Sequence, residues 1–266
     1  MQVSHPVPRL SFGTGAVPGQ RTLPAEIAVA LTFNGTTQAV MMATPSDLLD
    51  FAYGFTMTEG IASASEILSV EVVELPNGID LQIWLQPQAE DRLATRRRNR
   101  AGPVGCGLCG IESIDEAMRK LQPVPKSSFV MTPSQVMQAI AALPGAQPLH
   151  DATRAVHAAG YWCLALQSLR EDVGRHNALD KLVGHLVRAG TPPTGAVVLT
   201  SRVSIDMVQK VAALGAPILI AVSAPTVQAV TLADQAGITL IALARADRFE
   251  LFTHTDRIVD EEAHVA

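Results

Sequence analysis

The sequence predicts an α/β protein with a mostly parallel sheet whose two faces are covered by helices. Two features of the C-terminal half support this class. Short, nearly continuous apolar runs of strand length recur along the chain, and longer stretches of helical character separate them. Buried strands that alternate with helices in this way are typical of parallel sheets. Strands are expected at Trp162–Gln167, Ala196–Thr200, Pro217–Val222 and Ile238–Leu243, and helices at Asn177–Arg188, Ser204–Leu214 and Pro225–Ala236.

The N-terminal part has a different pattern, which predicts a smaller α+β subdomain over residues 25–125. Residues 1–24 are rich in Pro, Gly and Ser and are expected to form an irregular arm. Two apolar, partly β-branched runs, Glu26–Phe33 and Thr36–Met42, then flank Asn34-Gly35. This dipeptide is a strong hairpin signal because both residues tolerate a positive φ.

A helix is expected after this hairpin, opening at Thr44-Pro-Ser-Asp47 and ending at Gly60. Thr44 can cap the helix, Pro45 fits its first turn, and Asp47 suits the positive field of a helix N-terminus. Later elements are expected as a hairpin of Ile67–Leu75 and Ile79–Leu85, helices at Glu112–Leu121 and Pro133–Leu143, and a boundary near residue 125 that leaves residues 126–266 as the C-terminal α/β domain.

The composition excludes several classes of protein. The chain has 266 residues, of which 48% are hydrophobic and 17% charged, as in a globular protein. A net charge of -5 argues against a nucleic-acid binder. No apolar run reaches the roughly 20 residues of a membrane span, and the first ten residues do not resemble a signal peptide. Three cysteines, an odd number, do not suggest a disulfide framework, so we expect a cytoplasmic protein.

Cys106-Gly-Leu-Cys109 is the most informative motif of the chain. It lies in a glycine-rich run that leaves both thiols accessible, and nearby positive charge together with a following helix N-terminus favours the reactive thiolate. The spacing alone leaves sulfur exchange, a thioredoxin-like redox pair, a zinc site completed by other ligands, and a surface loop with incidental cysteines open. The positive charge comes from Arg92, Arg96, Arg97, Arg98 and Arg100.

A second group of ionisable residues lies between Glu171 and Lys181, where a strand gives way to a helix. Ligands of open α/β sheets bind at such strand ends, and helix-start amides with Arg175 favour a phosphate. His176 could donate a proton or a hydrogen bond. The alternative is a solvated helix N-terminus with Asp180 and Lys181 as surface charges.

Other polar residues follow the later strands. Ser223 ends one of them and could cap the next helix or line a pocket, while Arg245 and Arg248 could contact anionic oxygens or be solvated. His157, in a segment of small residues, is expected to be a half-buried core histidine rather than a ligand. Cys163 is expected in the core.

Taken together, these residues resemble the FdhD family of formate dehydrogenase accessory sulfurtransferases. The likeness extends from about residue 26 to residue 253, and the block that starts at Glu171 is its most specific part. The segments that carry it are Thr44-Pro45, Gly54-Phe55, Glu59-Gly-Ile61, Gly105-Cys-Gly-Leu-Cys-Gly110, His157-Ala-Ala159, Glu171-Asp-Val-Gly-Arg-His-Asn-Ala-Leu-Asp-Lys181, Thr200-Ser-Arg-Val-Ser204, Met207-Val208, Lys210 and Ser223-Ala-Pro-Thr226.

The resemblance implies a fold related to the cytidine deaminases, with a three-layer sheet, and a homodimer. It also implies a sulfur carrier that takes persulfide sulfur from a cysteine desulfurase. The acceptor would be the molybdenum bis(molybdopterin guanine dinucleotide) cofactor of the formate dehydrogenase catalytic subunit. Cys106 would carry the persulfide and Cys109 would assist. No permanent cofactor or metal site and no membrane or nucleic-acid partner is implied.

The same resemblance implies where the cofactor binds. The segment Leu243–Arg248 aligns with the family's cofactor contact, although Leu243 stands where relatives often carry an aromatic residue. The residues expected to contact the cofactor are Leu243, Ala244, Arg245, Ala246, Asp247, Arg248, Asp172, Arg175, His176 and Ser223.

Two other functions compete with this one. A zinc deaminase needs an H-x-E motif followed by P-C-x-x-C, but the cysteine pair here precedes both His157 and His176, and no glutamate follows either histidine at that spacing. We therefore reject deamination. A chaperone that binds the cofactor without carrying sulfur, and whose CxxC is structural, remains the alternative.

Overall fold

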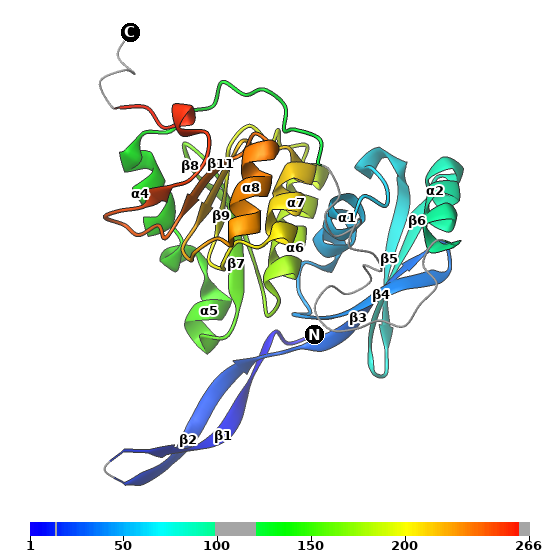
Figure 1. Ribbon diagram of the computed structural model, residues 1–266. Coiled ribbons are helices and arrows are strands. Elements are labelled where there is room, and N and C mark those ends of the chain that lie inside the picture. The colour runs from blue at the N-terminus through cyan, green and yellow to red at the C-terminus, as the bar shows by residue number, and fades with distance from the viewer. Residues whose placement is uncertain (14, 99–120, 261–266) are drawn as a thin grey trace.

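The computed structural model describes residues 1–13, 15–98 and 121–260, which form three β-sheets, two of them packed against helices (Figure 1). The cysteine motif and the helix expected at Glu112–Leu121, apart from its last residue, lie outside the described residues. No helix among the described residues is long and apolar enough to cross a membrane.

The described residues of the first 24 include two paired strands, so the prediction of an irregular arm was wrong. Strands β1 (Ser4–Phe12) and β2 (Ala16–Pro24) pair antiparallel along their full lengths and extend away from the rest of the chain (Figure 1). Their prolines hid this structure from the sequence analysis. In a two-stranded ribbon both strands are edges, where a residue without an N–H is tolerated.

The second sheet has four strands in the order β4-β3-β6-β5. Both hairpins expected from the sequence are confirmed, and Asn34 and Gly35 adopt the positive φ that the first turn requires. Helix α1 packs against one face of this sheet, in a core that includes Val29, Leu81 and Phe51. The elements are β3 (Ile27–Phe33), β4 (Thr36–Ala43), α1 (Leu48–Thr58), β5 (Ile67–Leu75), β6 (Gly78–Leu85) and α2 (Pro87–Arg98).

Helix α1 starts later than expected. Its N-cap is Asp47, with φ 52° and no side-chain cap, so Thr44 does not cap the helix. Thr44 is instead buried and bonds to the C-terminal half of the chain. Gly60 ends the helix as predicted, with φ 66°.

The third sheet has six strands in the order β12-β11-β10-β9-β7-β8. Strands β9, β10 and β11 are parallel, while β7 is antiparallel to both neighbours and β12 to β11. The sheet is therefore mixed, and the prediction of a mostly parallel sheet holds only for its centre. The single strand expected at Trp162–Gln167 was wrong, because Leu164 with φ 65° turns the chain between β7 and β8. The strands are β7 (His157–Cys163), β8 (Ala165–Asp172), β9 (Ala196–Leu199), β10 (Ile218–Ala221), β11 (Thr239–Ala242) and β12 (Glu250–Leu251).

Helices cover both faces of this sheet, which confirms a layered α/β architecture. One apolar core joins the sheet to α6 (Arg175–Arg188), α7 (Ile205–Leu214) and α8 (Val227–Gln235). A second core joins the opposite face to α4 (Pro133–Ala141). A short helix, α5 (Pro148–Thr153), precedes β7.

The two halves of the molecule meet where α1 crosses α6. Gly54 of α1 and Gly184 of α6 lie opposite each other, and a Cβ atom added to Gly54 would lie 1.7 Å from the carbonyl oxygen of Asp180. The backbones approach so closely that only glycine fits at these positions. This crossing holds α6, and the site that follows, against the N-terminal sheet.

Candidate functional site at the carboxyl edge of the sheet

Four strands of the six-stranded sheet end at one edge, which we call the carboxyl edge. Strands β9, β10 and β11 are parallel, and β8 runs in the same direction because β7 is antiparallel to both β8 and β9. His157 begins β7 at the same edge, opposite Asp172. The edge is formed by His157 and by residues 172–176, 200–206, 222–226 and 243–248.

The loops at this edge are tied to one another by backbone hydrogen bonds. The N–H of Leu243 donates to the carbonyl of Ser223 at 3.3 Å, and the N–H of Val203 donates to the carbonyl of Ala224 at 3.2 Å. The N–H of Thr200 donates to the carbonyl of Ala158 at 3.1 Å. The structure therefore brings together segments that lie far apart in the sequence.

Arg175 and His176 open α6 at this edge. Gly174 is the N-cap and offers no side-chain cap, so the first-turn amides are not satisfied by a capping side chain. Arg175 Nε is buried and has no hydrogen-bond partner among the described residues. Burial, and then the nearby charge of Arg202, lower the pKa of the Arg175 guanidinium. A buried donor without a partner, beside a second arginine, is suited to an anion.

His176 points toward α7. Its Nε2 atom lies 3.5 Å from Asp206 Oδ2, beyond a good hydrogen bond but close enough for an ion pair when the imidazole is protonated. Contact with His176 is the largest influence on Asp206 and holds the pKa of that carboxyl below its usual value. Arg202 and Asp206 were missed as site residues by the sequence analysis, although Arg202 lies in one of the segments that carry the resemblance.

His157 is partly buried at the start of β7. Desolvation lowers its pKa below the ordinary value of 6.5, and the positive charge of Arg175 lowers it further. His157 is thus close enough to Arg175 to be influenced by its charge.

Arg245 lies at the opposite end of the carboxyl edge. Its Nη1 atom donates to the carbonyl of Val222 at 2.5 Å and to its neighbour Ala244 at 2.8 Å, which fixes the guanidinium at the end of β10. The N–H of Arg245 donates to the carbonyl of Arg248 at 2.7 Å and closes an exposed turn.

The segment predicted to contact the cofactor divides into two kinds of residue. The side chains of Arg245, Ala246, Asp247 and Arg248 are exposed, Leu243 is partly buried, and the side chain of Ala244 is fully buried in the core. Ser223 is partly buried at the end of β10. Ala244 therefore supports the edge from beneath.

Asp172 was predicted to contact the cofactor, but its side chain points into the protein and not to the exposed side of the carboxyl edge. It is 0% exposed and accepts four hydrogen bonds, which the structure places beneath the start of α6. Lys181 is equally buried and donates to Asp172 Oδ2 at 2.6 Å and to the carbonyl of Thr44 at 2.8 Å.

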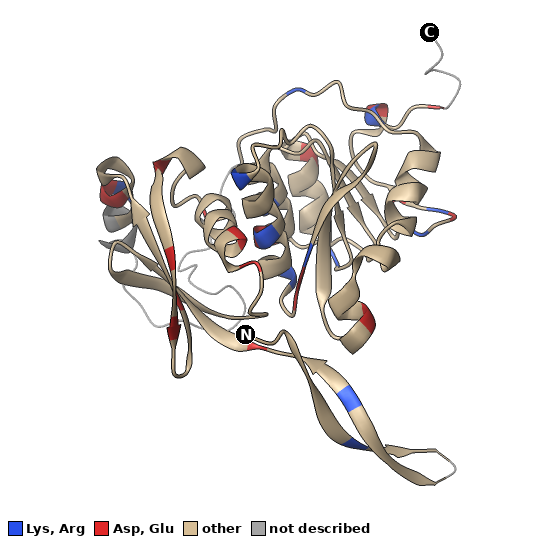
Figure 2. Cartoon of the chain, turned by 180° about the vertical axis from the view of Figure 1, so that it is seen from behind, with Lys and Arg blue, Asp and Glu red and all other residues tan. Residues whose placement is uncertain are grey.

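A second buried group joins α6 and α7 to the end of α1. Lys210 Nζ donates to both oxygens of Asp180, at 2.9 and 3.0 Å, and to Glu59 at 2.7 Å. The interpretation of Asp180 and Lys181 as surface charges was wrong, because both are almost completely buried against the N-terminal half. Acidic and basic positions gather on the helices between the two halves (Figure 2).

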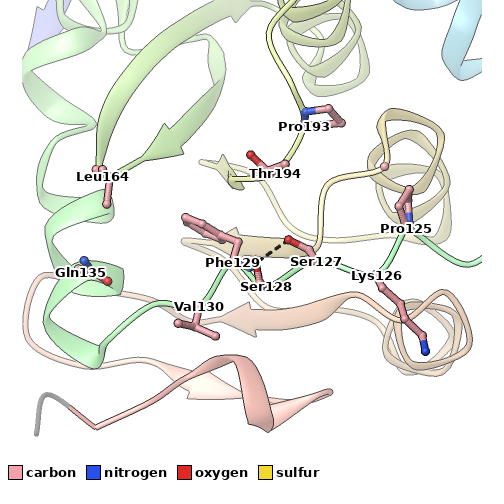
Figure 3. A pocket seen from close by; sticks show the side chains of 11 residues that line it. Pro125, Lys126, Ser127, Ser128, Phe129, Val130, Gln135, Leu164, Pro193 and Thr194 are labelled. Atoms are coloured by element: carbon pink, nitrogen blue, oxygen red, sulfur yellow. Dashed lines mark hydrogen bonds between the residues drawn. The ribbon is translucent and has the colours of Figure 1, made fainter. Parts of the chain in front are cut away.

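A cavity of about 680 Å³ lies at the other edge of the sheet, near the residues that precede β9 and β10 (Figure 3). Pro193 and Thr194 line one side, and Phe129 lines another. No predicted site residue among the described ones lines this cavity. The predicted residues therefore share the carboxyl edge and not this cavity.

The sulfur-bearing part of the predicted site is not described. Cys106, Cys109 and Arg100 lie outside the described residues. Cys163 is a partly buried free thiol packed against the main core. Among the described residues, no group of three or more His, Cys, Asp or Glu side chains could hold a metal ion.

Comparison with known proteins identifies the family. The family model for FdhD/NarQ matches residues 24–259. The chain belongs to the FdhD/NarQ family. Within this family, a protein named sulfur carrier protein FdhD from Agrobacterium fabrum is 52% identical over 254 residues, which cover 94% of this chain and 93% of the relative. A protein of the same name from Brucella abortus biovar 1 is 48% identical over 262 residues, with 97% of this chain and 96% of the relative covered.

A solved structure supports the fold of this FdhD/NarQ member. The crystal structure of a protein from Desulfotalea psychrophila, assigned as a formate dehydrogenase accessory protein, matches with a TM-score of 0.78 and 26% identity. The match covers 97% of this chain and 100% of the other. The mixed α/β architecture is confirmed in this way, and the kinship with cytidine deaminases stays a prediction.

Proposed function

We propose that this FdhD/NarQ protein is a cytoplasmic, homodimeric sulfurtransferase. It accepts persulfide sulfur from a cysteine desulfurase and delivers it to the molybdenum bis(molybdopterin guanine dinucleotide) cofactor that formate dehydrogenase needs. One observation carries this proposal. The chain holds the pair Cys106 and Cys109 and is 52% identical, over nearly its whole length, to a protein named as a sulfur carrier.

The chemistry of the thiols accounts for loading. The thiolate of Cys106 attacks the terminal sulfur of the donor persulfide, the S–S bond of the donor breaks, and the donor leaves as a thiolate. A new S–S bond then holds the sulfur on Cys106. Attack of the Cys109 thiolate on the Sγ atom of Cys106 releases hydrosulfide and leaves a disulfide. The two cysteines thus supply the two electrons of the released sulfide, and a thiol reductant restores them.

The carboxyl edge supports binding of the client cofactor. A guanine dinucleotide carries phosphates, and a chain with a net charge of -5 needs local positive charge to hold them. Arg175, with its buried unpartnered Nε atom, and the nearby Arg202 provide that charge, and Arg245 lies at the other end of the edge. The start of α6 adds backbone N–H groups that face the same side.

A direct test loads the protein with sulfur. The purified chain is incubated with a cysteine desulfurase and cysteine, and intact and peptide masses are measured. We expect the peptide that contains Cys106 to gain the mass of one sulfur atom. The same peptide of the Cys106→Ala variant should show no gain. Cys163→Ala is the matched control and should load like the wild type, because Cys163 packs against the core.

The alternative makes an opposite forecast. A chaperone that binds the cofactor without carrying sulfur predicts that Cys106→Ala still activates formate dehydrogenase. If the wild-type chain gains no sulfur, and the Cys106→Ala variant still activates formate dehydrogenase, the protein is a cofactor-binding chaperone and not a sulfurtransferase.

A further inference from the structure

We propose that Asp172 is a positioning residue that sets the start of α6 and thereby places Arg175 and His176 at the carboxyl edge. The inference deepens the proposed function, because it concerns the same edge, but its geometry is independent of the ligand. Asp172 is the last residue of β8, and α6 starts three residues later.

Both oxygens of the Asp172 carboxylate are used locally and at long range. Oδ1 accepts from the N–H of Gly174 at 2.8 Å and from Asn177 Nδ2 at 3.0 Å, so it holds the N-cap and the first turn of α6. Oδ2 accepts from the N–H of Thr44 at 3.0 Å and from Lys181 Nζ at 2.6 Å. The Asp172 side chain therefore holds the first turn of α6, which carries Arg175 and His176, and ties it to Thr44 and to Lys181 further along the helix.

The residues around the carboxylate are shaped for this role. A Cβ atom added to Gly174 would lie 2.8 Å from Asn177 Nδ2 and 3.4 Å from Asp172 Oδ1, so a side chain at this position would disturb the arrangement. Asn177 Nδ2 also donates to the carbonyl of Met42 at 2.9 Å, and Thr44 Oγ1 accepts from the N–H of Val173 at 3.1 Å. The strand end is thus clamped onto the segment that leads from β4 to α1.

Lys181 balances the charge of Asp172 inside the protein. Both side chains are 0% exposed, and Lys181 lies on α6 itself, so the ion pair joins the strand end to the body of the helix. A buried carboxylate without its cation is strongly unfavourable, because the charge has neither water nor a partner to stabilise it. The folded protein therefore keeps Asp172 and Lys181 together in one arrangement. Loss of the pair would free the start of α6 to move.

Asp180 supplies a matched comparison. It lies on the same helix, is 1% exposed and forms a buried ion pair with Lys210, but its other partner is Thr58 at the end of α1. Asp180→Asn therefore weakens the interface between the halves without touching the first turn of α6. A difference between Asp172→Asn and Asp180→Asn separates positioning of the edge from general stability.

The experiment measures two properties of the full-length chain and of both variants. The first is the affinity for GDP, used as a probe for the nucleotide part of the client cofactor, by titration calorimetry. The second is amide hydrogen exchange at residues 174–178, with the thermal midpoint as the measure of stability. Asp172→Asn is expected to lower GDP affinity about tenfold or more, because small displacements of a binding group are costly, and to speed exchange at 174–178. Asp180→Asn is expected to lower the thermal midpoint while both other properties stay at the wild-type values.

Each result decides the proposal. Unchanged exchange at 174–178 in Asp172→Asn, or an equal increase in both variants, overturns it. A wild-type chain that does not bind GDP contradicts nucleotide binding at this edge, and the exchange data alone then decide whether Asp172 positions α6. If Asp172→Asn does not fold, Asn177→Ala replaces it, because that change removes only the donor to Asp172 Oδ1 and to Met42; faster exchange at 174–178 supports the proposal and unchanged exchange overturns it.

Discussion

Substitution of Gly54 by alanine tests whether the crossing of α1 and α6 holds the two halves together. The added Cβ atom would lie 1.7 Å from the carbonyl oxygen of Asp180 and 2.9 Å from the N–H nitrogen of Gly184. Both atoms belong to the backbone of α6, so no side-chain rotation relieves the overlap. A separation of 3.0 Å, the least that real Cβ atoms show, requires the helices to move apart by about 1.3 Å.

That movement would stretch the buried contacts on either side of the crossing. Thr58, the last residue of α1, donates to Asp180 of α6 at 2.6 Å across this crossing. Lys210 of α7 donates to the same Asp180 at 2.9 Å and to Glu59, just past α1, at 2.7 Å. Overpacking costs about 1–3 kcal/mol and loss of a buried ion pair about 3–5 kcal/mol, against a gain of about 1 kcal/mol from the higher helix propensity of alanine. Together these terms span about 3–7 kcal/mol. Because Lys210 can keep its bond to Asp180 while its bond to Glu59 stretches, we expect Gly54→Ala to lower the free energy of unfolding by the lower end of this range, about 3 kcal/mol.

Urea denaturation followed by tryptophan fluorescence measures this change, since Trp84 reports the four-stranded sheet and Trp162 the six-stranded sheet. Gly145→Ala is the control, because a Cβ atom there meets nothing within 4 Å and should leave stability nearly unchanged. A Gly54→Ala protein within about 0.5 kcal/mol of the wild type would show that the helices separate freely, and would refute the reasoning.

Three further predictions concern charged or titratable side chains. Lys210→Met leaves Asp180 buried without its cation and should cost about 3–5 kcal/mol in urea denaturation, whereas Asp180→Leu combined with Lys210→Met should cost much less; equal losses would contradict a net cost for the unpaired charge. His157 has a lowered pKa, so the unfolded chain takes up a proton that the folded chain excludes, and stability is lost as pH falls below 6.5. His157→Gln should therefore flatten the fall of the thermal midpoint in acid, and an unchanged slope would count against it. Arg202→Ala should weaken GDP binding about tenfold by removing a charge-assisted contact, with no change in the thermal midpoint, and undiminished affinity would exclude it from the site.

Much of the fold could be predicted because its signals are local. Asn34-Gly35 marks a turn through its tolerance of positive φ, and the apolar runs of β9, β10 and β11 have the length of buried strands. The turn at Leu164 could not be predicted, because leucine rarely adopts a positive φ and the surrounding apolar run has no break in the sequence. The proline-rich hairpin of residues 1–24 was missed for a related reason, since proline is a poor guide in strands whose edges are free.

The candidate site divides in the same way. Arg175 and His176 could be placed from sequence, because a charged block between a strand and a helix marks the end of a strand. The neighbourhood of Arg202 and Asp206 could not be seen, because it depends on which strand ends lie next to each other in the sheet. The local sequence pattern identifies which residues are charged and lie at strand ends. Only the order of the strands in the sheet decides which of these residues lie next to one another.

The sequence by itself determined the family and the order of most helices and strands, and it supplied the candidate residues for anion binding and for sulfur transfer. These properties follow from motifs and from the periodicity of side chains, which reside in short stretches of chain. Only the tertiary structure decided that Asp172 and Lys181 are buried rather than solvated, and that Thr44 is a partner of a carboxylate 128 positions away. Burial and pairing of charges depend on which surfaces meet, and in this protein the two halves meet where Gly54 and Gly184 let α1 and α6 come into backbone contact.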